Sequence, residues 1–377
     1  MIKSLRNRVL ANGLASNKHN VTIISFDFDS HAPENVHYIH LERGYDSLYG
    51  NGSEKNNDIM QRHNQNSFAA VVSFYKFGYL GCKGARNSDG LKFLLNYPLD
   101  FKFDLVIYDF TCGPCLLGLL HRFGNAPLIS VSAFNTPAFH TTLIGGHKNF
   151  AYIPHFAVHY GSEMSFKQRF HNFLIHLFDV VFRDYVFLPK IQWMTEDIYD
   201  RTTPLLNELE KRTSLMLVNS NPAFDFIESL PPNVISVGGL QVLAPKPLQD
   251  DLKLFIEGGK KGSVLFAMGT NFKSSMLSIE TQRNIVAAFK TMPSYNFLWK
   301  FDKTSIEGIA TPKNLKISAW LPQNDVLAHR NVVGFISHCG LLSTHEAYWH
   351  AVPIIGIPVY ADQKRVETLI LRLGISN

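Results

Sequence analysis

One stretch near the end of the chain, Trp320–Gln363, constrains the fold more than any other. A short apolar run at 332–337 ends at His338, and small and polar residues lead from there into a helical pattern at 344–351. A second apolar run follows at 352–358. The pattern predicts a strand, a loop, a helix and a second strand. In an open α/β sheet, ligands bind beyond the carboxyl ends of the strands, where loops lead into helices.

Polar side chains gather at the end of this predicted strand. His338, Ser343 and Glu346 lie at or just beyond it, and Ser343 and Thr344 carry the short hydroxyls that often precede a helix. A helix N-terminus presents unpaired N–H groups and a partial positive charge, so it suits a phosphate group. The stretch therefore predicts a site for a nucleotide diphosphate.

Other groups suit the remaining parts of such a ligand. Trp320 offers a flat face to a base, and Gln323 offers polar contacts to a ribose. Asp362–Gln363 follows the second strand with groups that suit sugar hydroxyls. The turn Gly269–Thr270 follows an earlier predicted strand, and its glycine allows close backbone approach while its hydroxyl adds a donor.

The whole stretch resembles, without a gap, the signature motif of the UDP-glycosyltransferases, particularly their insect branch. The resemblance implies that Trp320 stacks on uracil, that Gln323 and Glu346 hold the ribose, and that His338 contacts the diphosphate. The donor-binding residues that it implies are Gly269, Thr270, Trp320, Gln323, His338, Gly340, Ser343, Glu346, Asp362 and Gln363, the last two on the donor sugar. Many members have a glycine where this chain has Cys339, whose β-carbon we expect to crowd the diphosphate.

The rest of the chain is similar to that family in its element order. Strands that alternate with helices predict parallel sheets, and a length of 377 residues favours two domains. The resemblance implies an α/β fold of GT-B architecture, with two Rossmann-like doubly wound domains facing a cleft. We expect an acceptor-binding domain at 1–243, a Pro-containing linker at 244–250 and a UDP-sugar-binding domain at 251–377.

The resemblance also implies that the catalytic base is missing. In the family, a histidine follows a first strand and is partnered by an aspartate, which matches Asp109 at the end of a buried strand at 103–109. Counting back from His19, the position of the partner histidine falls near Lys3. We therefore expect this chain to lack the first strand with its histidine loop, and to lack the final helices and the membrane anchor. The missing strand is expected to lie between 21–27 and 104–109.

These features predict an inverting, metal-independent transfer of a hexose from a UDP-sugar to a hydroxyl of a small lipophilic acceptor. Gln363 favours glucose by family analogy. The alternative is a catalytically impaired UDP-sugar-binding fragment without the base histidine. A minor alternative is a thiol-disulfide redox protein, since Cys112 and Cys115 follow a strand and open a helix, as in thioredoxin-like sites. Four cysteines do not predict a disulfide framework in so long a chain.

Several function classes are disfavoured. A net charge of +5 without clustered Lys and Arg argues against nucleic-acid binding, and the absence of a G-x-G-x-x-G motif argues against an NAD or FAD site. His345 and His350 are about 140° apart around a helix, so they do not converge on one ion. We expect no metal and no cofactor, with the UDP-sugar acting as co-substrate.

Membrane association and location follow only from the resemblance, which implies a detoxification enzyme on the lumenal side of the endoplasmic reticulum membrane. This chain opens without a signal-peptide pattern and has no apolar run of the roughly 18 residues that span a bilayer. Self-association is left open. The aromatic stretch at 166–189 fits either a helix on a membrane surface or a helix that lines the acceptor site.

Overall fold

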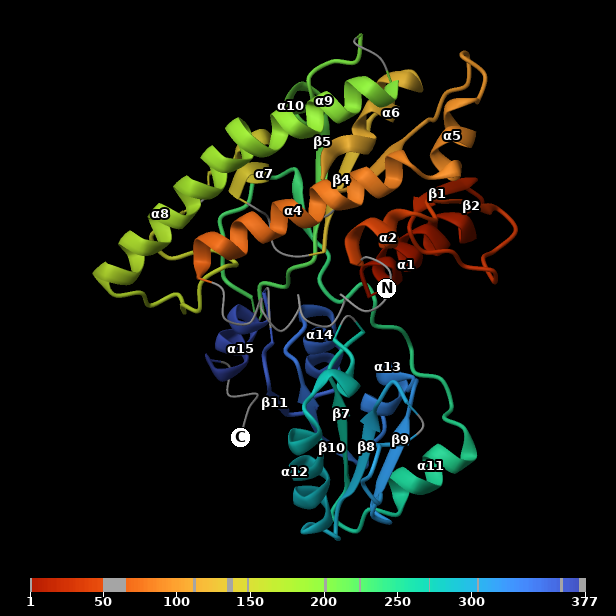
Figure 1. Cartoon of the computed structure of the whole chain (residues 1–377), viewed down its shortest axis with the longest axis vertical. Helices are drawn as coiled ribbons and strands as arrows, with labels where there is room; N and C mark the ends of the chain where they lie inside the picture. Colours follow the sequence, from red (N-terminus) through yellow and green to blue (C-terminus); the bar gives the residue numbers. More distant parts are fainter. Residues whose placement is uncertain are drawn as a thin grey trace. The chain divides into compact units, whose positions relative to one another are not determined.

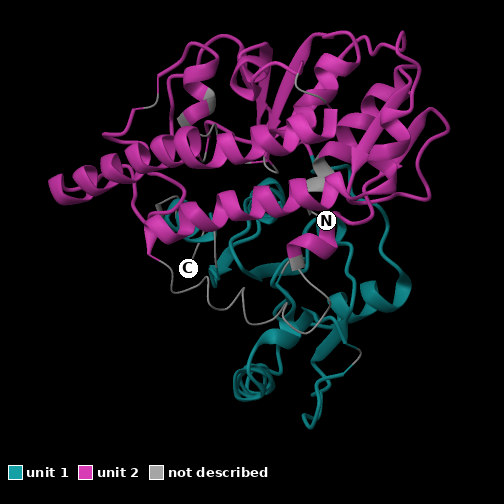
Figure 2. Cartoon of the chain, turned by 45° about the horizontal axis from the view of Figure 1, so that its top comes forward, with its two compact units in different colours: residues 1–2, 241–377 teal, residues 3–240 magenta. Residues whose placement is uncertain are grey.

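The computed structural model describes residues 2–49, 66–110, 113–133, 138–147, 149–199, 202–223, 225–270, 272–303, 305–359 and 362–372. They form two compact units, coloured separately in Figure 2. The N-terminal unit comprises 3–240, and the C-terminal unit comprises 241–377 together with the first two residues. Every strand pair in the described residues is parallel, so each unit is an α/β structure.

The N-terminal unit holds two sheets. The larger has the order β3–β4–β5–β6 and the smaller pairs β1 with β2 (Figure 1). The strands are β1 (Val21–Ser25), β2 (Val36–His40), β3 (Val106–Asp109), β4 (Leu128–Ser132), β5 (Thr213–Val218) and β6 (Val234–Ser236). Within the described residues β1 and β3, which we expected to flank one further strand, are the outer strands of separate sheets.

Helices surround these sheets. They are α1 (Ile2–Ser16), α2 (Gly44–Tyr49), α4 (Ser67–Arg86), α5 (Asp89–Leu95), η2 (Pro114–Leu117), α6 (Gly118–Arg122), α7 (Ala138–Leu143), α8 (Phe166–Phe182), η3 (Arg183–Phe187), α9 (Leu188–Tyr199) and α10 (Leu206–Glu210). The main core of the unit forms where α4, α8 and α9 contribute buried apolar residues, among them Val71, Ile175 and Ile191. α4 and α8 contact each other within this core.

A disulfide ties α4 to the turn that follows β3. Cys82 of α4 is bonded to Cys115 of η2, with 5.9 Å between the two Cα atoms. The minor alternative of a redox pair at Cys112 and Cys115 is therefore wrong, because Cys115 is already bonded to Cys82; Cys112 itself lies outside the described residues. The four cysteines did not predict a disulfide framework, and this one bond joins partners that are 33 residues apart in sequence.

The C-terminal unit is one doubly wound sheet of order β11–β10–β7–β8–β9. Its strands are β7 (Ser263–Ala267), β8 (Asn296–Lys300), β9 (Leu315–Ser318), β10 (Val332–Ser337) and β11 (Ile354–Gly356), and its helices are α11 (Asp250–Glu257), η4 (Ser274–Met276), α12 (Ile279–Lys290), α13 (Gln323–Leu327), α14 (Leu341–Trp349) and α15 (Gln363–Arg372). The predicted strand, loop, helix and strand over 332–358 are confirmed as β10, α14 and β11.

The strand order places a topological switch point in this sheet. After β7 the chain adds β8 and β9 on one side and then returns to place β10 on the other side of β7. The connections that leave the carboxyl ends of β7 and β10 therefore run in opposite directions, which opens a crevice at that edge. The stretch at 244–250, expected as a linker, lies in this unit, where the Lys246 backbone N–H donates to Asp325 Oδ1 at 3.0 Å.

Candidate functional site

His338 occupies the switch point, directly after β10. Its imidazole lies against two glycines: a β-carbon at Gly269 or at Gly340 would come within 2.5 Å of His338 Nε2. Gly269 also has a φ of +81°, which a glycine adopts without strain. The two predicted glycines thus admit the ring between the ends of β7 and β10, and any larger residue at either position would displace it.

The imidazole of His338 is neutral at physiological pH. Burial and the positive charge of Lys300 lower its pKa to about 4, against a smaller contribution from a hydrogen bond with the Ala267 backbone. His338 is 7% exposed. It therefore suits a hydrogen bond to a phosphate oxygen rather than an ion pair.

A polar cluster connects α13 to α14 beside this histidine. Gln323 Nε2 donates to Ser343 Oγ at 3.0 Å and to Glu346 Oε2 at 2.6 Å. Glu346 is buried, and burial raises its pKa to about 7, although the Gln323 hydrogen bond and the positive charge of Lys300 oppose the shift. Three residues predicted to bind the donor are thus brought together, and the carboxyl group among them titrates near neutral pH.

Trp320 and Lys300 border the same cluster. The Trp320 side chain is 65% exposed, and Lys300 Nζ lies 4.7 Å from the centroid of its indole ring. Burial lowers the pKa of Lys300, while the negative charge of Glu346 acts in the other direction. Lys300 was not among the predicted residues. The signal that identifies it is its place as the last residue of β8, at the carboxyl edge of the sheet.

α14 begins at Leu341, three residues after His338. Gly340 is its N-cap residue, and no side chain caps the helix. Thr344, predicted as a helix-preceding hydroxyl, instead lies inside the helix and donates from Oγ1 to the Gly340 carbonyl at 3.1 Å. Ser343 is also inside the first turn, where its hydroxyl accepts from Gln323. Uncapped N–H groups at this point suit a phosphate.

Cys339 adopts a left-handed conformation with φ of +60°, which is uncommon for a residue with a side chain. The residue is fully buried, and its sulfur points toward β11: a β-carbon at Gly356 would lie 2.6 Å from Cys339 Sγ. Burial raises the pKa of the thiol. Gly356 therefore leaves the space that the cysteine side chain occupies, and the sulfur packs against β11.

Gln363 and Asp362 lie where α15 begins. Gln363 is buried, and its Oε1 accepts a hydrogen bond from the Val359 backbone N–H at 2.8 Å. The Asp362 backbone carbonyl accepts from Val366 N–H at 2.9 Å, inside the first turn. Gln363 thus holds the backbone at Val359, and its contact with a sugar stays a prediction.

Asp109, the predicted partner of a catalytic base, ends β3 in the N-terminal unit. Its Oδ2 accepts a hydrogen bond from Asn7 Nδ2 of α1 at 2.9 Å. Lys3, the position nearest the expected histidine, lies in α1, and its side chain is outside the part of the chain that the structure describes. The side chain seen to donate to Asp109 is thus the carboxamide of Asn7, which lies about one turn after Lys3 in α1.

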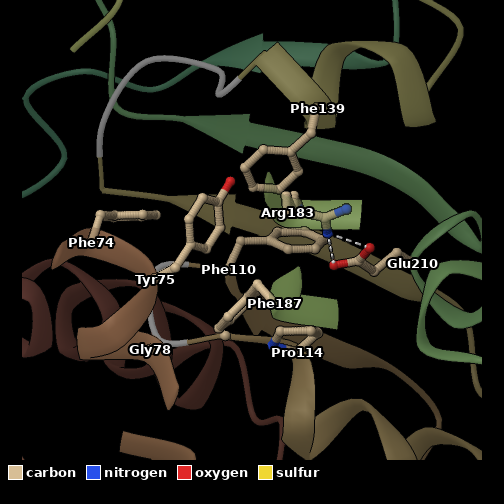
Figure 3. Close-up of a pocket in the computed structure, with 10 residues that line it drawn as sticks. Phe74, Tyr75, Gly78, Phe110, Pro114, Phe139, Arg183, Phe187 and Glu210 are labelled. Carbon is tan, nitrogen blue, oxygen red and sulfur yellow. Dashed lines mark hydrogen bonds and ion pairs between the residues drawn. The ribbon is translucent and has the colours of Figure 1, made fainter. Parts of the chain in front are cut away.

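An aromatic cavity of about 20 Å³ lies at the carboxyl end of β3, where Phe110 forms part of its lining. Figure 3 shows its lining, which includes Phe74, Tyr75, Phe110, Phe139 and Phe187. Arg183 and Glu210 close one side of it. Arg183 Nη2 donates to both carboxylate oxygens at 2.6 Å, and the guanidinium lies 4.0 Å from the centroid of the Phe139 ring. The cavity as it stands has room for about one water molecule.

Within the described ranges, no group of three His, Cys, Asp or Glu side chains is arranged to hold a metal ion. Nor does any helix in those ranges have the length and apolar character needed to cross a bilayer.

Comparisons with known proteins agree with this geometry. A family model described as UDP-glucoronosyl and UDP-glucosyl transferase matches residues 46–370. UDP-glucosyltransferase 2 of Dactylopius coccus is 34% identical over 280 residues, which cover 74% of this chain and 53% of that protein. The 2-hydroxyacylsphingosine 1-beta-galactosyltransferase of Mus musculus is 26% identical over 372 residues, which cover 98% of this chain and 66% of that protein. The chain thus spans about half the length of the Dactylopius coccus relative.

A solved structure shares the fold. The crystal structure of the glycotransferase of kitacinnamycin superposes with a TM-score of 0.59 at 15% identity, covering 99% of this chain and 81% of that one. The predicted α/β fold class of GT-B type is thereby confirmed. The resemblance of the stretch around His338 is confirmed as well, and the chain belongs to the UDP-glycosyltransferase family.

Proposed function

We propose that the C-terminal unit binds a UDP-sugar at the switch point between β7 and β10. One observation carries the proposal: Gln323 joins Ser343 and Glu346 into a single polar cluster, with exposed Trp320 and the Lys300 cation beside it. An indole face, a carboxyl group hydrogen-bonded to an amide, and a cation suit the base, the ribose and the diphosphate in turn.

The donor contacts follow from this arrangement and from the family. Trp320 stacks on uracil, and Gln323 with Glu346 binds the ribose hydroxyls. The diphosphate takes hydrogen bonds from the neutral His338 and from the first turn of α14, with Lys300 as its counter-charge. The hexose lies toward Asp362 and Gln363, and glucose is the favoured sugar because the Dactylopius coccus relative is named a glucosyltransferase.

The proposed reaction transfers the hexose, with inversion and without a metal, to a hydroxyl of a small lipophilic acceptor. Asp109 ends β3 at the carboxyl edge of the N-terminal sheet, and the residue after it, Phe110, belongs to a group of aromatic side chains that suits an apolar acceptor. The mouse relative, named for a 2-hydroxyacylsphingosine acceptor, also supports a lipophilic substrate. Location in the lumen of the endoplasmic reticulum is proposed because the disulfide between Cys82 and Cys115 requires an oxidising compartment.

The hydrogen bond from Asn7 to Asp109 favours a second candidate function, a UDP-sugar-binding chain with impaired transfer. A carboxamide does not take up a proton at neutral pH, so Asn7 is not a base for the acceptor hydroxyl. In an Asn7→His variant, the ring nitrogen Nδ1 would be bonded to Cγ, as Asn7 Nδ2 is now, and could therefore reach Asp109 in the same way. The imidazole would then be oriented by Asp109, as a base is oriented by its acidic partner in hydrolase triads.

A UDP-release assay separates the two functions. The chain and its Asn7→His variant are each incubated with UDP-glucose and a panel of small phenols and alcohols. Release by the parent chain, abolished in Asp109→Asn, is the result expected for a transferase. A flat parent with release gained in Asn7→His would reject transfer by this chain and support the impaired binder. No release from either, with intact UDP-glucose binding, would reject the role given to Asp109.

The raised pKa of Glu346 predicts that donor binding depends on pH. Above pH 7 its carboxylate accepts hydrogen bonds from the ribose, and below pH 7 protonation removes that acceptor, so affinity should fall as the pH is lowered. A single group with a pKa of about 7 gives about tenfold weaker binding at pH 6 than at pH 8. UDP-glucose is the probe for calorimetry, because its diphosphate has no ionisable group near neutral pH.

Two variants control this measurement. Glu346→Gln should bind more weakly than the parent at pH 8 and lose the dependence between pH 6 and 8. Glu280→Gln, which changes an exposed glutamate of α12, should keep the parent's profile. The same slope in the parent and in Glu346→Gln would show that another group titrates, and would contradict the role of Glu346.

A further inference from the structure

Lys300 carries a charge that reaches several residues of the candidate donor site. Its Nζ lies 4.7 Å from the centroid of the Trp320 ring. Its positive charge adds to burial in lowering the pKa of His338, and it opposes the effect of burial on the pKa of Glu346. A lysine charge sits on a flexible four-carbon stem, so its position depends on how firmly the backbone at the base of the stem is held.

Ser274 holds that backbone through its side-chain hydroxyl. Ser274 Oγ donates to the Lys300 carbonyl at 3.0 Å and accepts from Trp299 Nε1 at 3.1 Å. Trp299 is fully buried, and its indole packs against the rings of Phe266 and Phe301. The indole N–H therefore has a fixed position. Moving the hydroxyl would leave a buried donor and a carbonyl without this partner, which is costly.

The segment that carries Ser274 leads away from the predicted donor turn. β7 ends at Ala267, the turn Gly269–Thr270 follows, and η4 begins at Ser274. The next residue strengthens the attachment, because the Ser275 backbone N–H donates to Asp302 Oδ1 at 2.9 Å and its hydroxyl donates to Oδ2 at 2.6 Å. η4 is thus fastened both to the last residue of β8 and to the residues just after it.

The hydroxyl of Ser274 is turned toward the protein and away from a ligand. Ser274 is 2% exposed. A serine hydroxyl has one hydrogen to donate, and here the Lys300 carbonyl receives it. An effect of Ser274 on donor binding therefore passes through the residues that it holds.

We propose that Ser274 is a positioning residue for the UDP-sugar site: it fixes the end of β8, from which the Lys300 side chain extends toward the diphosphate. The inference rests on the proposed donor site, in which Lys300 is the counter-charge. A cation whose base is already fixed loses less conformational freedom when an anion binds, and the affinity for the anion is correspondingly higher.

Calorimetric titration of UDP and of uridine into the whole chain tests this role. The variants are Ser274→Ala, Lys300→Met and the two combined. Ser274→Ala should weaken UDP binding by at least about fivefold, which is a coupling typical of residues in contact. It should change uridine binding much less, because uridine lacks the diphosphate that Lys300 faces. In the Lys300→Met background, Ser274→Ala should have no further effect on UDP, since the positioned cation is gone.

Ser278→Ala is the matched control. It removes a hydroxyl from the same segment, where Ser278 caps α12 by accepting from the Thr281 backbone N–H at 3.1 Å. This variant should bind UDP and uridine like the parent. Circular dichroism shows whether each variant folds. If Ser274→Ala does not, Ser274→Cys replaces it under the same criteria, because a thiol fills similar space and is a weak hydrogen-bonding group.

Three results would overturn the role of Ser274 while leaving the donor site in place. One is equal UDP affinity in the parent and in the folded Ser274 variant. Another is a loss that is as large in the Lys300→Met background as in the parent. The third is a loss that is as large for uridine as for UDP, because Ser274 would then act on the fold as a whole. A parent chain that does not bind UDP would instead reject the donor site, and this inference with it.

Discussion

Replacing Cys82 with alanine is expected to lower the free energy of unfolding of the N-terminal unit by about 3–4 kcal/mol. The bond to Cys115 closes a loop across 33 residues, and the chain entropy that such a cross-link removes from the unfolded state corresponds to that range. Both cysteines are buried, so the change also removes packing around the sulfur atoms. A loss of this size is a large fraction of the stability of an ordinary domain.

Urea denaturation followed by far-ultraviolet circular dichroism measures this loss. The parent chain under strong reductant should approach the Cys82→Ala variant, because both lack the cross-link. Cys339→Ala is the matched control: it removes a buried cysteine that is not bonded to another, in the other unit, and should not respond to reductant differently from the parent. A parent whose unfolding is the same with and without reductant would contradict the role of the disulfide.

The disulfide also illustrates which features were beyond sequence reasoning. Cys112 and Cys115 suggested a local pair because a strand, two cysteines and a helix follow one another. The observed bond instead depends on where α4 lies against η2, which is a matter of tertiary packing. Lys300 was missed for a related reason, because its proximity to Trp320 follows from the order of the strands and not from its neighbours in sequence.

The donor stretch was predictable because its elements are local. β10, α14 and β11 follow directly from apolar runs and a helical pattern, and a parallel sheet brings the ends of its strands to one edge. The clustering of Gln323 with Glu346 agrees with that prediction. The finer details required coordinates: the sulfur of Cys339 points to Gly356, and Gln363 holds the Val359 backbone.

Less of the N-terminal unit could be predicted from the sequence. Asp109 was predicted at the end of its strand, but its contact with Asn7 depends on how α1 packs, which the helical pattern of α1 does not specify. The two interpretations of 166–189 could not be separated by periodicity either, since a stripe of apolar residues predicts a buried face as readily as one on a membrane. The buried hydrogen bonds of Asn172 and Asp179, together with Ile175 in the core, show which side of the helix faces inward.

Replacing Trp320 with alanine is expected to weaken UDP binding by on the order of 1–3 kcal/mol, which is the contribution of stacking a base on an aromatic ring. The indole is 65% exposed, so the change should leave the fold of the C-terminal unit intact. The loss should be larger than the effect of an exposed aromatic residue elsewhere, because Trp320 lies beside Lys300 at the edge where β8 ends.

Calorimetric titration of UDP into the parent chain, Trp320→Ala and Trp349→Ala tests the donor site most directly. Trp349 is the matched control, since it is 71% exposed and belongs to α14 of the same unit. The account predicts binding by the parent, unchanged binding by Trp349→Ala and a loss of on the order of 1–3 kcal/mol in Trp320→Ala. Equal affinities in all three, or a parent chain that does not bind UDP, would contradict it.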